Sequence, residues 1–208
     1  MAESPETKEA IIDAAESRFA AQGFDSTTIK QIAGDAGVNT ALIYYYFADK
    51  EALYHAMVER LILKIAGTMS NVLAGATDPV SAVQQFAKQH HAFLEAHPRM
   101  PRLVVRELVD HDAAHAQAAI AQLVAGTFEK LRGAIAAGQA AGIFRADLDP
   151  RFVAISLVSQ TTYFNVARPA ISLIFANGGP IPTELGEAFA EHAGKFTLAA
   201  LAPVGTRS

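Results

Sequence analysis

Apolar residues recur every three to four positions along most of the chain, which is the spacing of one face of an α-helix. This pattern predicts helices over about residues 11–22, 28–36, 39–46, 49–75, 78–96, 101–110, 112–141, 149–166 and 183–201. No segment alternates between apolar and polar residues as a strand would, and no repeat is present. The sequence therefore predicts an all-α protein of about nine helices.

The ends of these helices carry recognisable signals. Thr28 and Gln31 have the spacing of a capping box. Asp78-Pro79 and Asp149-Pro150 each place a capping residue ahead of a proline in the first turn. The strongest break lies at residues 177–182, which hold two glycines and two prolines.

Helix lengths divide the chain into two parts. The first three helices are short and sharply capped, whereas those after about residue 75 are long and have wide apolar faces. Short helices joined by tight turns present side chains, and long apolar helices build cores and interfaces. We therefore predict two domains, over residues 5–65 and 66–208.

Composition narrows the possible functions. The 208 residues are 51% apolar and carry 17 basic against 21 acidic side chains, a formal charge of −4. This charge argues against a generally basic protein that coats nucleic acid, but it allows one local DNA-reading face. The absence of cysteine excludes disulfides, thiolate metal sites and a cysteine nucleophile.

Targeting and membrane segments are not evident in the sequence. The amino terminus lacks the basic and apolar regions of a secretory signal, so we expect a cytoplasmic protein. The mean hydropathy is +0.19, and residues 152–167 carry no charge. Polar residues interrupt this stretch, which therefore reads as a helix buried between protein surfaces and not as a membrane span.

A tight turn separates the second and third predicted helices. It reads Ala36-Gly37-Val38-Asn39, as in a helix-turn-helix. On the third helix the inward residues would be Val38, Leu42, Ile43 and Phe47. The opposite face would then present Asn39, Thr40, Ala41, Tyr44 and Tyr45. A recognition helix needs this division, because one side anchors it while the other meets base edges.

The sequence around this turn has a long match to a known family. Residues 27–53 read TTIKQIAGDAGVNTALIYYYFADKEAL and closely resemble the DNA-binding region of TetR-family transcriptional regulators. The approach through Phe19 and Gly23-Phe24 belongs to the same match, which covers roughly residues 5–65. The remainder resembles the family in size and helix pattern.

The resemblance implies a set of DNA contacts within the motif at residues 28–47 and just after it. These contacts would be made by Thr28, Lys30, Asn39, Thr40, Ala41, Tyr44, Tyr45, Tyr46 and Lys50. Residues 39–41 would face base edges, and the tyrosines would contact bases or backbone. Lys50 would hold a phosphate through its side chain or its N–H.

Two departures from the family pattern affect this surface. Tyr46 stands where the family usually has histidine, and Thr40 stands where it often has a basic residue. Residues 1–50 carry four basic and eight acidic side chains, a net charge of −4. Because salt dependence scales with the number of neutralised phosphates, we expect DNA binding with a shallow dependence on salt.

The second domain offers two readings of its aromatic residues. Phenylalanines there either fill the core or line an apolar cavity with a few polar anchors. The resemblance favours a cavity for a small apolar effector, with Phe86, His90, Phe93, Arg106, Phe128 and Phe164 as candidates. Helices 149–166 and 183–201 are apolar on more than one side, which predicts a homodimer contact. The dimer would set two recognition helices roughly 34–36 Å apart on a palindrome-like operator.

Histidines suggest a metal site, but the pattern is incomplete. His111 and His115 are four residues apart, and His90, His91 and His97 are further candidates. Zinc needs three or four fixed ligands, and the glutamate of a His-Glu-x-x-His motif is missing. We expect no metal, no cofactor and no enzymatic activity. The alternatives left open are an all-α dimeric protein that binds small molecules without reading DNA, and a histidine-metal enzyme.

Overall fold

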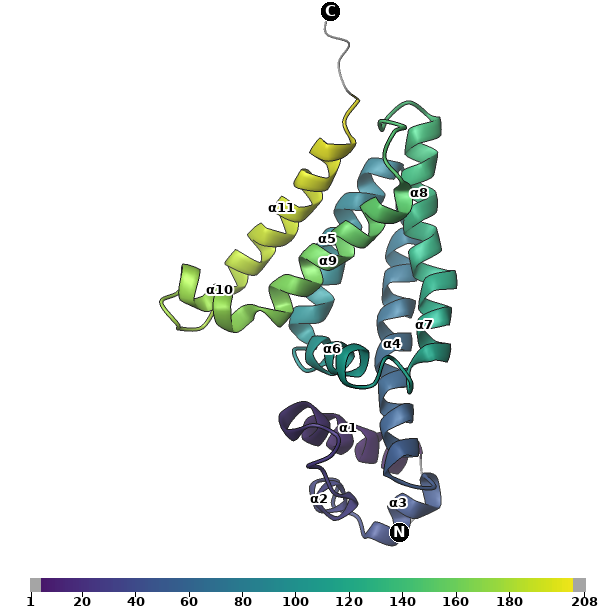
Figure 1. Ribbon diagram of the computed structural model, residues 1–208, viewed down its shortest axis with the longest axis vertical. Helices are drawn as coiled ribbons and strands as arrows, with labels where there is room; N and C mark the ends of the chain where they lie inside the picture. The colour runs from purple at the N-terminus through teal and green to yellow at the C-terminus, as the bar shows by residue number, and fades with distance from the viewer. Residues whose placement is uncertain (1–4, 204–208) are drawn as a thin grey trace, which may run out of the picture. The chain divides into compact units, whose positions relative to one another are not determined.

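The computed structural model describes residues 5–203, which form helices and no strand (Figure 1). The α-helices are α1 (Pro5–Gln22), α2 (Ile29–Asp35), α3 (Thr40–Tyr46), α4 (Lys50–Ala74), α5 (Pro79–Ala96), α6 (Met100–Asp110), α7 (Gln117–Leu123), α8 (Glu129–Ala140), α9 (Pro150–Val166), α10 (Arg168–Phe175) and α11 (Thr183–Leu201). A π-helical segment, η1 (Val124–Phe128), joins α7 to α8. The all-α prediction is confirmed.

These helices form two compact units. The first runs up to Lys64 and also takes in Arg99–Ile120, whereas the second holds Ile65–Pro98 and the chain from Ala121 onwards. Helix α6 thus joins the amino-terminal helices and packs against α1. Helix α4 begins in the first unit and ends in the second. The prediction that residues 5–65 and 66–208 have separate functions stays a prediction.

The short helices of the first unit start where the sequence predicts. The backbone N–H of Gln31 donates to Oγ1 of Thr28, and the N–H of Thr28 donates to Oε1 of Gln31, which completes the capping box. Oδ1 of Asn39 accepts from the N–H of Leu42 at 2.8 Å and caps α3. Between them Gly37 takes a φ of +67°, a left-handed conformation that glycine adopts without strain. This turn fixes α3 against α2.

The long helix predicted from residue 112 begins later and is interrupted. Asp112 and Ala113 have φ values of 49° and 60°, so residues 111–116 form a turn and α7 starts at Gln117. The sequence pattern missed this turn because alanine strongly favours helix. Within η1 the hydroxyl of Thr127 donates to the carbonyl of Ala66 at 2.9 Å, a tertiary contact that no local pattern reveals.

Helix α5 is the centre of the second unit, where it packs against α8, α9 and α11. Asp78 and Asp149 cap α5 and α9 as predicted. The core side chains include Val83, Phe86, Leu131, Ile135 and Leu157, each at most 2% exposed. Among residues 5–203, no helix is both long and apolar enough to cross a membrane.

Candidate DNA interface and ligand cavities

Helix α3 presents a polar strip on one side and buries the other. Ile43 is fully buried and Phe47 is 6% exposed, whereas Tyr44 and Tyr45 are 55% and 64% exposed. Residues 39–41 are exposed as well. The five residues predicted for the outward face of this helix, Asn39, Thr40, Ala41, Tyr44 and Tyr45, are therefore all exposed, and none of them is charged.

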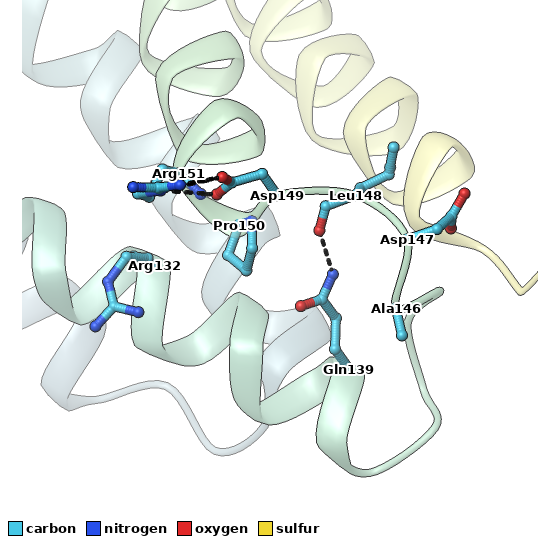
Figure 2. A pocket seen from close by; sticks show the side chains of 8 residues that line it. All are labelled: Arg132, Gln139, Ala146, Asp147, Leu148, Asp149, Pro150 and Arg151. Carbon is cyan, nitrogen blue, oxygen red and sulfur yellow. Dashed lines mark hydrogen bonds and ion pairs between the residues drawn. The ribbon is translucent and has the colours of Figure 1, made fainter.

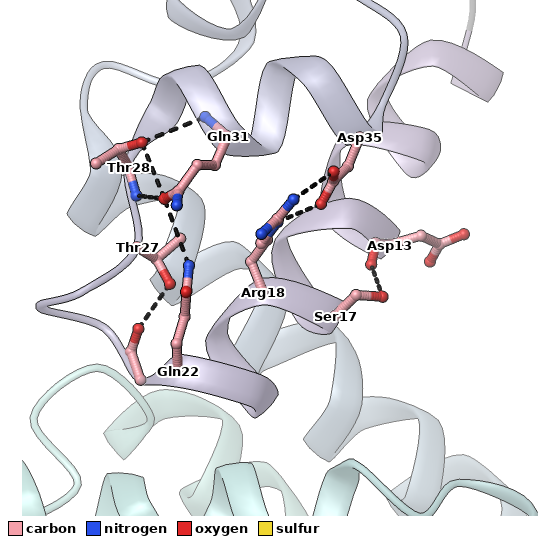
Figure 3. Close-up of polar contacts among 9 residues, drawn as sticks. Asp13, Ser17, Arg18, Gln22, Thr27, Thr28, Gln31 and Asp35 are labelled. Carbon is pink, nitrogen blue, oxygen red and sulfur yellow. Dashed lines mark hydrogen bonds and ion pairs between the residues drawn. The ribbon is translucent and has the colours of Figure 1, made fainter.

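Two of the predicted contact residues also serve as helix caps. The hydroxyl of Thr28 donates to Oε1 of Gln31 at 3.0 Å, as Figure 3 shows, so its proton is already used. The cap made by Asn39 uses Oδ1 alone and leaves its amide nitrogen able to donate to a base or a phosphate. Asn39 therefore fits base readout better than Thr28 does.

Lys50 lies differently from its expected role. Its ammonium donates to the carbonyls of Phe24 and Thr27 at 2.9 and 3.1 Å, and it lies 4.2 Å from the centre of the Phe24 ring. The Lys50 side chain therefore holds the α1–α2 connection. The backbone N–H of Lys50, at the start of α4, is the group that remains to bind a phosphate. Partners 23 and 26 residues away could not be found from the sequence.

Few basic side chains remain near the strip. Arg18 forms a two-bond ion pair with Asp35, which lowers the pKa of that carboxyl (Figure 3). Among the basic residues from 18 to 50, Lys30 alone forms no hydrogen bond or ion pair within the described part of the chain. Lys30 is exposed and is thus available for a phosphate, and Lys8 of α1, also exposed, lies over the Phe47 ring at the end of α3.

A buried polar cluster lies elsewhere in the first unit, among α4, α6 and the turn before α7. Glu107 is 1% exposed and accepts from the N–H and Nδ1 of His115 at 2.8 and 3.2 Å. Tyr54 is 2% exposed, and burial together with Glu107 raises the pKa of its phenol. His111 packs against the Tyr54 ring. The two histidines of the i, i+4 pair are thus part of an aromatic packing cluster, and no group of three or more ligands in residues 5–203 is arranged for a metal.

The candidate effector residues divide between the two units. Arg106 belongs to the first unit, where it donates to the carbonyl of Phe19 at 3.1 Å. His90 bonds Thr161 at 2.7 Å and stacks on Phe86. Phe86, His90, Phe93 and Phe164 are all buried, and Phe128 is half-buried. These four buried residues lie in the core of the second unit, and their role in lining an effector cavity stays a prediction.

The cavities found in the second unit have other linings. One of about 510 Å³ lies beside the start of α9, where Asp149 pairs with Arg151 and Gln139 donates to the carbonyl of Leu148 at 2.7 Å (Figure 2). Its charges neutralise one another, and the pairing lowers the pKa of Asp149 to about 2. This arrangement anchors the α8–α9 connection and leaves no obvious charge for a ligand.

A second hollow, of about 480 Å³, lies between α9 and α11. Phe152 and Phe196 at its edge are 68% and 59% exposed, and Ile155 and Tyr163 of α9 are 50% and 69% exposed. Large apolar side chains that gather on one exposed face mark an interaction surface. The two helices predicted to make a dimer contact therefore do carry uncovered apolar groups.

Known families match most of the chain. The model described as "Bacterial regulatory proteins, tetR family" matches residues 11–57. The model described as "Tetracyclin repressor-like, C-terminal domain" matches residues 79–180. The first match contains the strip on α3, and the second contains α5 to α10.

Individual relatives and solved structures agree with these matches. The chain is 27% identical to the HTH-type transcriptional repressor NicS of Pseudomonas putida over 82% of this chain and 81% of that protein. It is 28% identical to the HTH-type transcriptional regulator RutR of Escherichia coli over 80% of this chain and 77% of that one. The fatty acid degradation regulator FadR of Bacillus halodurans shares the fold, with a TM-score of 0.72, 19% identity and coverage of 100% and 99%. FadR of Bacillus subtilis, solved in complex with stearoyl-CoA, has a TM-score of 0.71 at 18% identity, with coverage of 93% and 98%.

Proposed function

Because the chain belongs to the tetR family of bacterial regulatory proteins, we propose that it is a repressor that a small apolar molecule releases from its operator. The observation that carries the proposal is the exposed, uncharged polar strip on α3, backed by buried Ile43 and Phe47. Amide, hydroxyl and methyl groups on such a strip suit the edges of bases in the major groove. A protein with this role acts in the cytoplasm.

Around the strip, phosphate contacts would fix the register of the helix on DNA. Lys30 supplies a cation and Tyr46 supplies a hydroxyl group, whereas the hydroxyl of Thr28 is already held by Gln31. Lys50 would contribute its backbone N–H, since helix amino termini bind anions without a charged side chain. Because few of these phosphate contacts involve a cation, they agree with the expected shallow dependence of DNA binding on salt.

The second unit would supply the dimer contact and the response to the effector. Exposed Phe152, Ile155 and Phe196 favour a symmetric contact through α9 and α11, which would present two α3 helices to a palindrome-like operator. Stearoyl-CoA in the Bacillus subtilis FadR structure supports an apolar effector. Helix α4 has residues in both units and is the continuous element through which binding would act. To shift the protein from 1:99 to 99:1 in favour of the state released from DNA, the effector would have to bind that state more tightly than the DNA-binding state by about 5.5 kcal/mol.

The first test is a gel shift with the DNA that flanks the chain's own gene. Tyr44→Ala combined with Asn39→Ala should weaken operator binding by about 100-fold, because a good base contact contributes roughly 1–3 kcal/mol. Asn71→Ala, at an exposed asparagine of α4 outside the strip, is the matched control. The dimer should persist, and the thermal midpoint should fall only slightly, because Asn39→Ala also removes the cap of α3.

Full operator affinity in the double variant would overturn the proposal. The rival function, a dimeric small-molecule-binding protein without DNA readout, draws on the excess of acidic residues in the first fifty. It predicts no sequence-specific shift from the parent protein at all.

Salt dependence gives an independent test of where the contacts lie. With one Lys30 from each protomer in contact with a phosphate, the slope of log affinity against log salt should be about −2. DNA-binding titrations at salt concentrations from about 50 to 300 mM measure this slope. A slope near −10, typical of a heavily basic repressor, would show that the contacts are misplaced.

A further inference from the structure

The outward strip of α3 lacks the side chains that usually read guanine. The strip consists of Asn39, Thr40, Ala41, Tyr44 and Tyr45. Arginine and lysine are the common guanine readers, because each donates to O6 and N7 in the major groove. Lys30 lies on α2, and this helix crosses the phosphate backbone in a helix-turn-helix while the next helix reads bases. The strip therefore has no positively charged group for a G·C pair.

Asn39 does not take the place of such a reader. Its Oδ1 accepts from the backbone N–H of Leu42 at 2.8 Å, and an N–H needs an acceptor, so the orientation of the amide is fixed. Asparagine distinguishes adenine by accepting from N6 while it donates to N7. Because Oδ1 is held against the helix backbone, Nδ2 is the group that remains to reach a base. N7 is an acceptor on both purines, so this donor does not separate A·T from G·C pairs.

The tyrosines of the strip also add little selectivity. A phenol hydroxyl both donates and accepts, so it suits a phosphate or any of the four bases. The ring of Tyr45 packs edge-on against Tyr46, with 5.2 Å between the ring centres, which holds it beside the strip. Selectivity among bases must therefore come from the other residues of α3.

Thr40 and Ala41 present methyl groups in the first turn of α3. Both are exposed, and the first turn is the part of a recognition helix that meets base edges. Tyr44 and Tyr45 lie one turn further along, next to Thr40 and Ala41 on the helix surface. Among the four bases, thymine alone carries a methyl group in the major groove, and alanine and threonine methyls are its usual apolar contacts. The strip therefore matches the edge of a T·A pair.

We propose that α3 selects its operator by contact between the methyl groups of Thr40 and Ala41 and the 5-methyl groups of thymines. Each half-site then carries thymine at the positions that these two residues contact, and guanine is disfavoured there. This inference rests on the proposed repressor function and adds the class of sequence that the strip reads. Apolar contact needs no charge, which agrees with a surface that neutralises few phosphates.

Synthetic DNA tests the contact one methyl group at a time. Selection from random duplexes by the full chain gives the operator, and each of its thymines is then replaced by deoxyuridine, which pairs alike but lacks the 5-methyl group. Binding should weaken about fourfold for each contacted methyl, and about 15-fold when both half-sites are changed. At the same position, 5-methylcytosine should bind about fourfold more tightly than cytosine, because it restores the methyl group.

Two substitutions at Thr40 separate its methyl group from its hydroxyl. Thr40→Ser removes the methyl and keeps the hydroxyl, so the deoxyuridine penalty should disappear at the thymine that Thr40 contacts. Thr40→Val keeps a methyl and loses the hydroxyl, so the same penalty should remain. Thermal unfolding of both proteins checks that each one folds.

A matched pair of glycine variants tests Ala41. Ala41→Gly should abolish the penalty at the thymine that Ala41 contacts. Ala10→Gly makes the same chemical change at an exposed position of α1 and should retain every penalty. Because each penalty compares two DNA probes with one protein, a general loss of stability cancels.

The outcomes distinguish this inference from the function on which it rests. A selected operator in which no thymine responds to deoxyuridine, or in which guanine occupies the contacted positions, would overturn the inference and leave the repressor function standing. Penalties that persist in both the Thr40→Ser and the Ala41→Gly proteins would do the same. A selection that enriches no sequence would overturn the proposed function and this inference with it.

Discussion

The exposed caps of α2 and α3 in the first unit and the buried histidine pairs of the second unit span very different distances along the chain. In the first unit, the caps of α2 and α3 join residues three positions apart, Thr28 to Gln31 and Asn39 to Leu42. In the second, His90 bonds Thr161 and His91 bonds Asn165, across 71 and 74 residues. Local caps shape a surface, whereas distant buried pairs set how long helices pack. The comparison suggests that the first unit is built to present groups and the second to enclose them.

The largest expected effect tests whether the buried phenylalanines of the second unit pack in the core or line a cavity. Phe86 is 2% exposed, and Phe86→Ala should lower the free energy of unfolding by about 3–5 kcal/mol, the usual cost of a large core truncation. Urea denaturation measures it. Phe175→Ala, at a residue 63% exposed, is the control and should cost far less. Unchanged stability with loss of an apolar ligand would instead make Phe86 a cavity wall.

The buried histidine pair should make stability depend on pH. Burial lowers the pKa of His90 to about 4 from an ordinary value near 6.5. The unfolded chain therefore takes up a proton first as the pH falls, and about 3 kcal/mol of stability should be lost between pH 6.5 and 4. Denaturation at a series of pH values measures this loss.

Variants isolate the contribution of His90 from that of other titrating groups. His90→Phe should flatten the pH dependence over this range, whereas His55→Phe, at an exposed histidine of α4, should retain it. An unchanged slope in the His90→Phe protein would show that the buried pair does not control stability in acid.

The smallest expected effect lies in the first unit, at the turn before α7. Ala113 has a φ of 60°, a conformation that costs a residue with a Cβ about 1–2 kcal/mol. Ala113→Gly should therefore stabilise the protein by up to about 1 kcal/mol, after the larger chain entropy of glycine is subtracted. Ala114→Gly, next to it without a positive φ, should be neutral or destabilising. A gain at both positions or at neither would contradict the assigned turn.

Sequence patterns predicted these features to different extents. The caps at Thr28, Asn39 and Asp78 were predictable because a capping side chain and its target lie within three residues. The turn at residues 111–116 was not, because it depends on Glu107 holding His115 against the alanines' own preference for helix. The use of Lys50 inside the first unit and the placement of Arg106 there depend in the same way on distant carbonyl groups.

By itself the sequence determined the all-helical architecture, the capped starts of α2, α3, α5 and α9, and the polar face of α3. Each of these follows from side chains a few residues apart and from a period of 3.6. Only the tertiary structure decided which candidate residues share a site, because burial and pairing depend on helices brought together from distant parts of the chain. His90 illustrates the difference, since its hydrogen bond to Thr161 joins α5 to α9, which no local pattern connects.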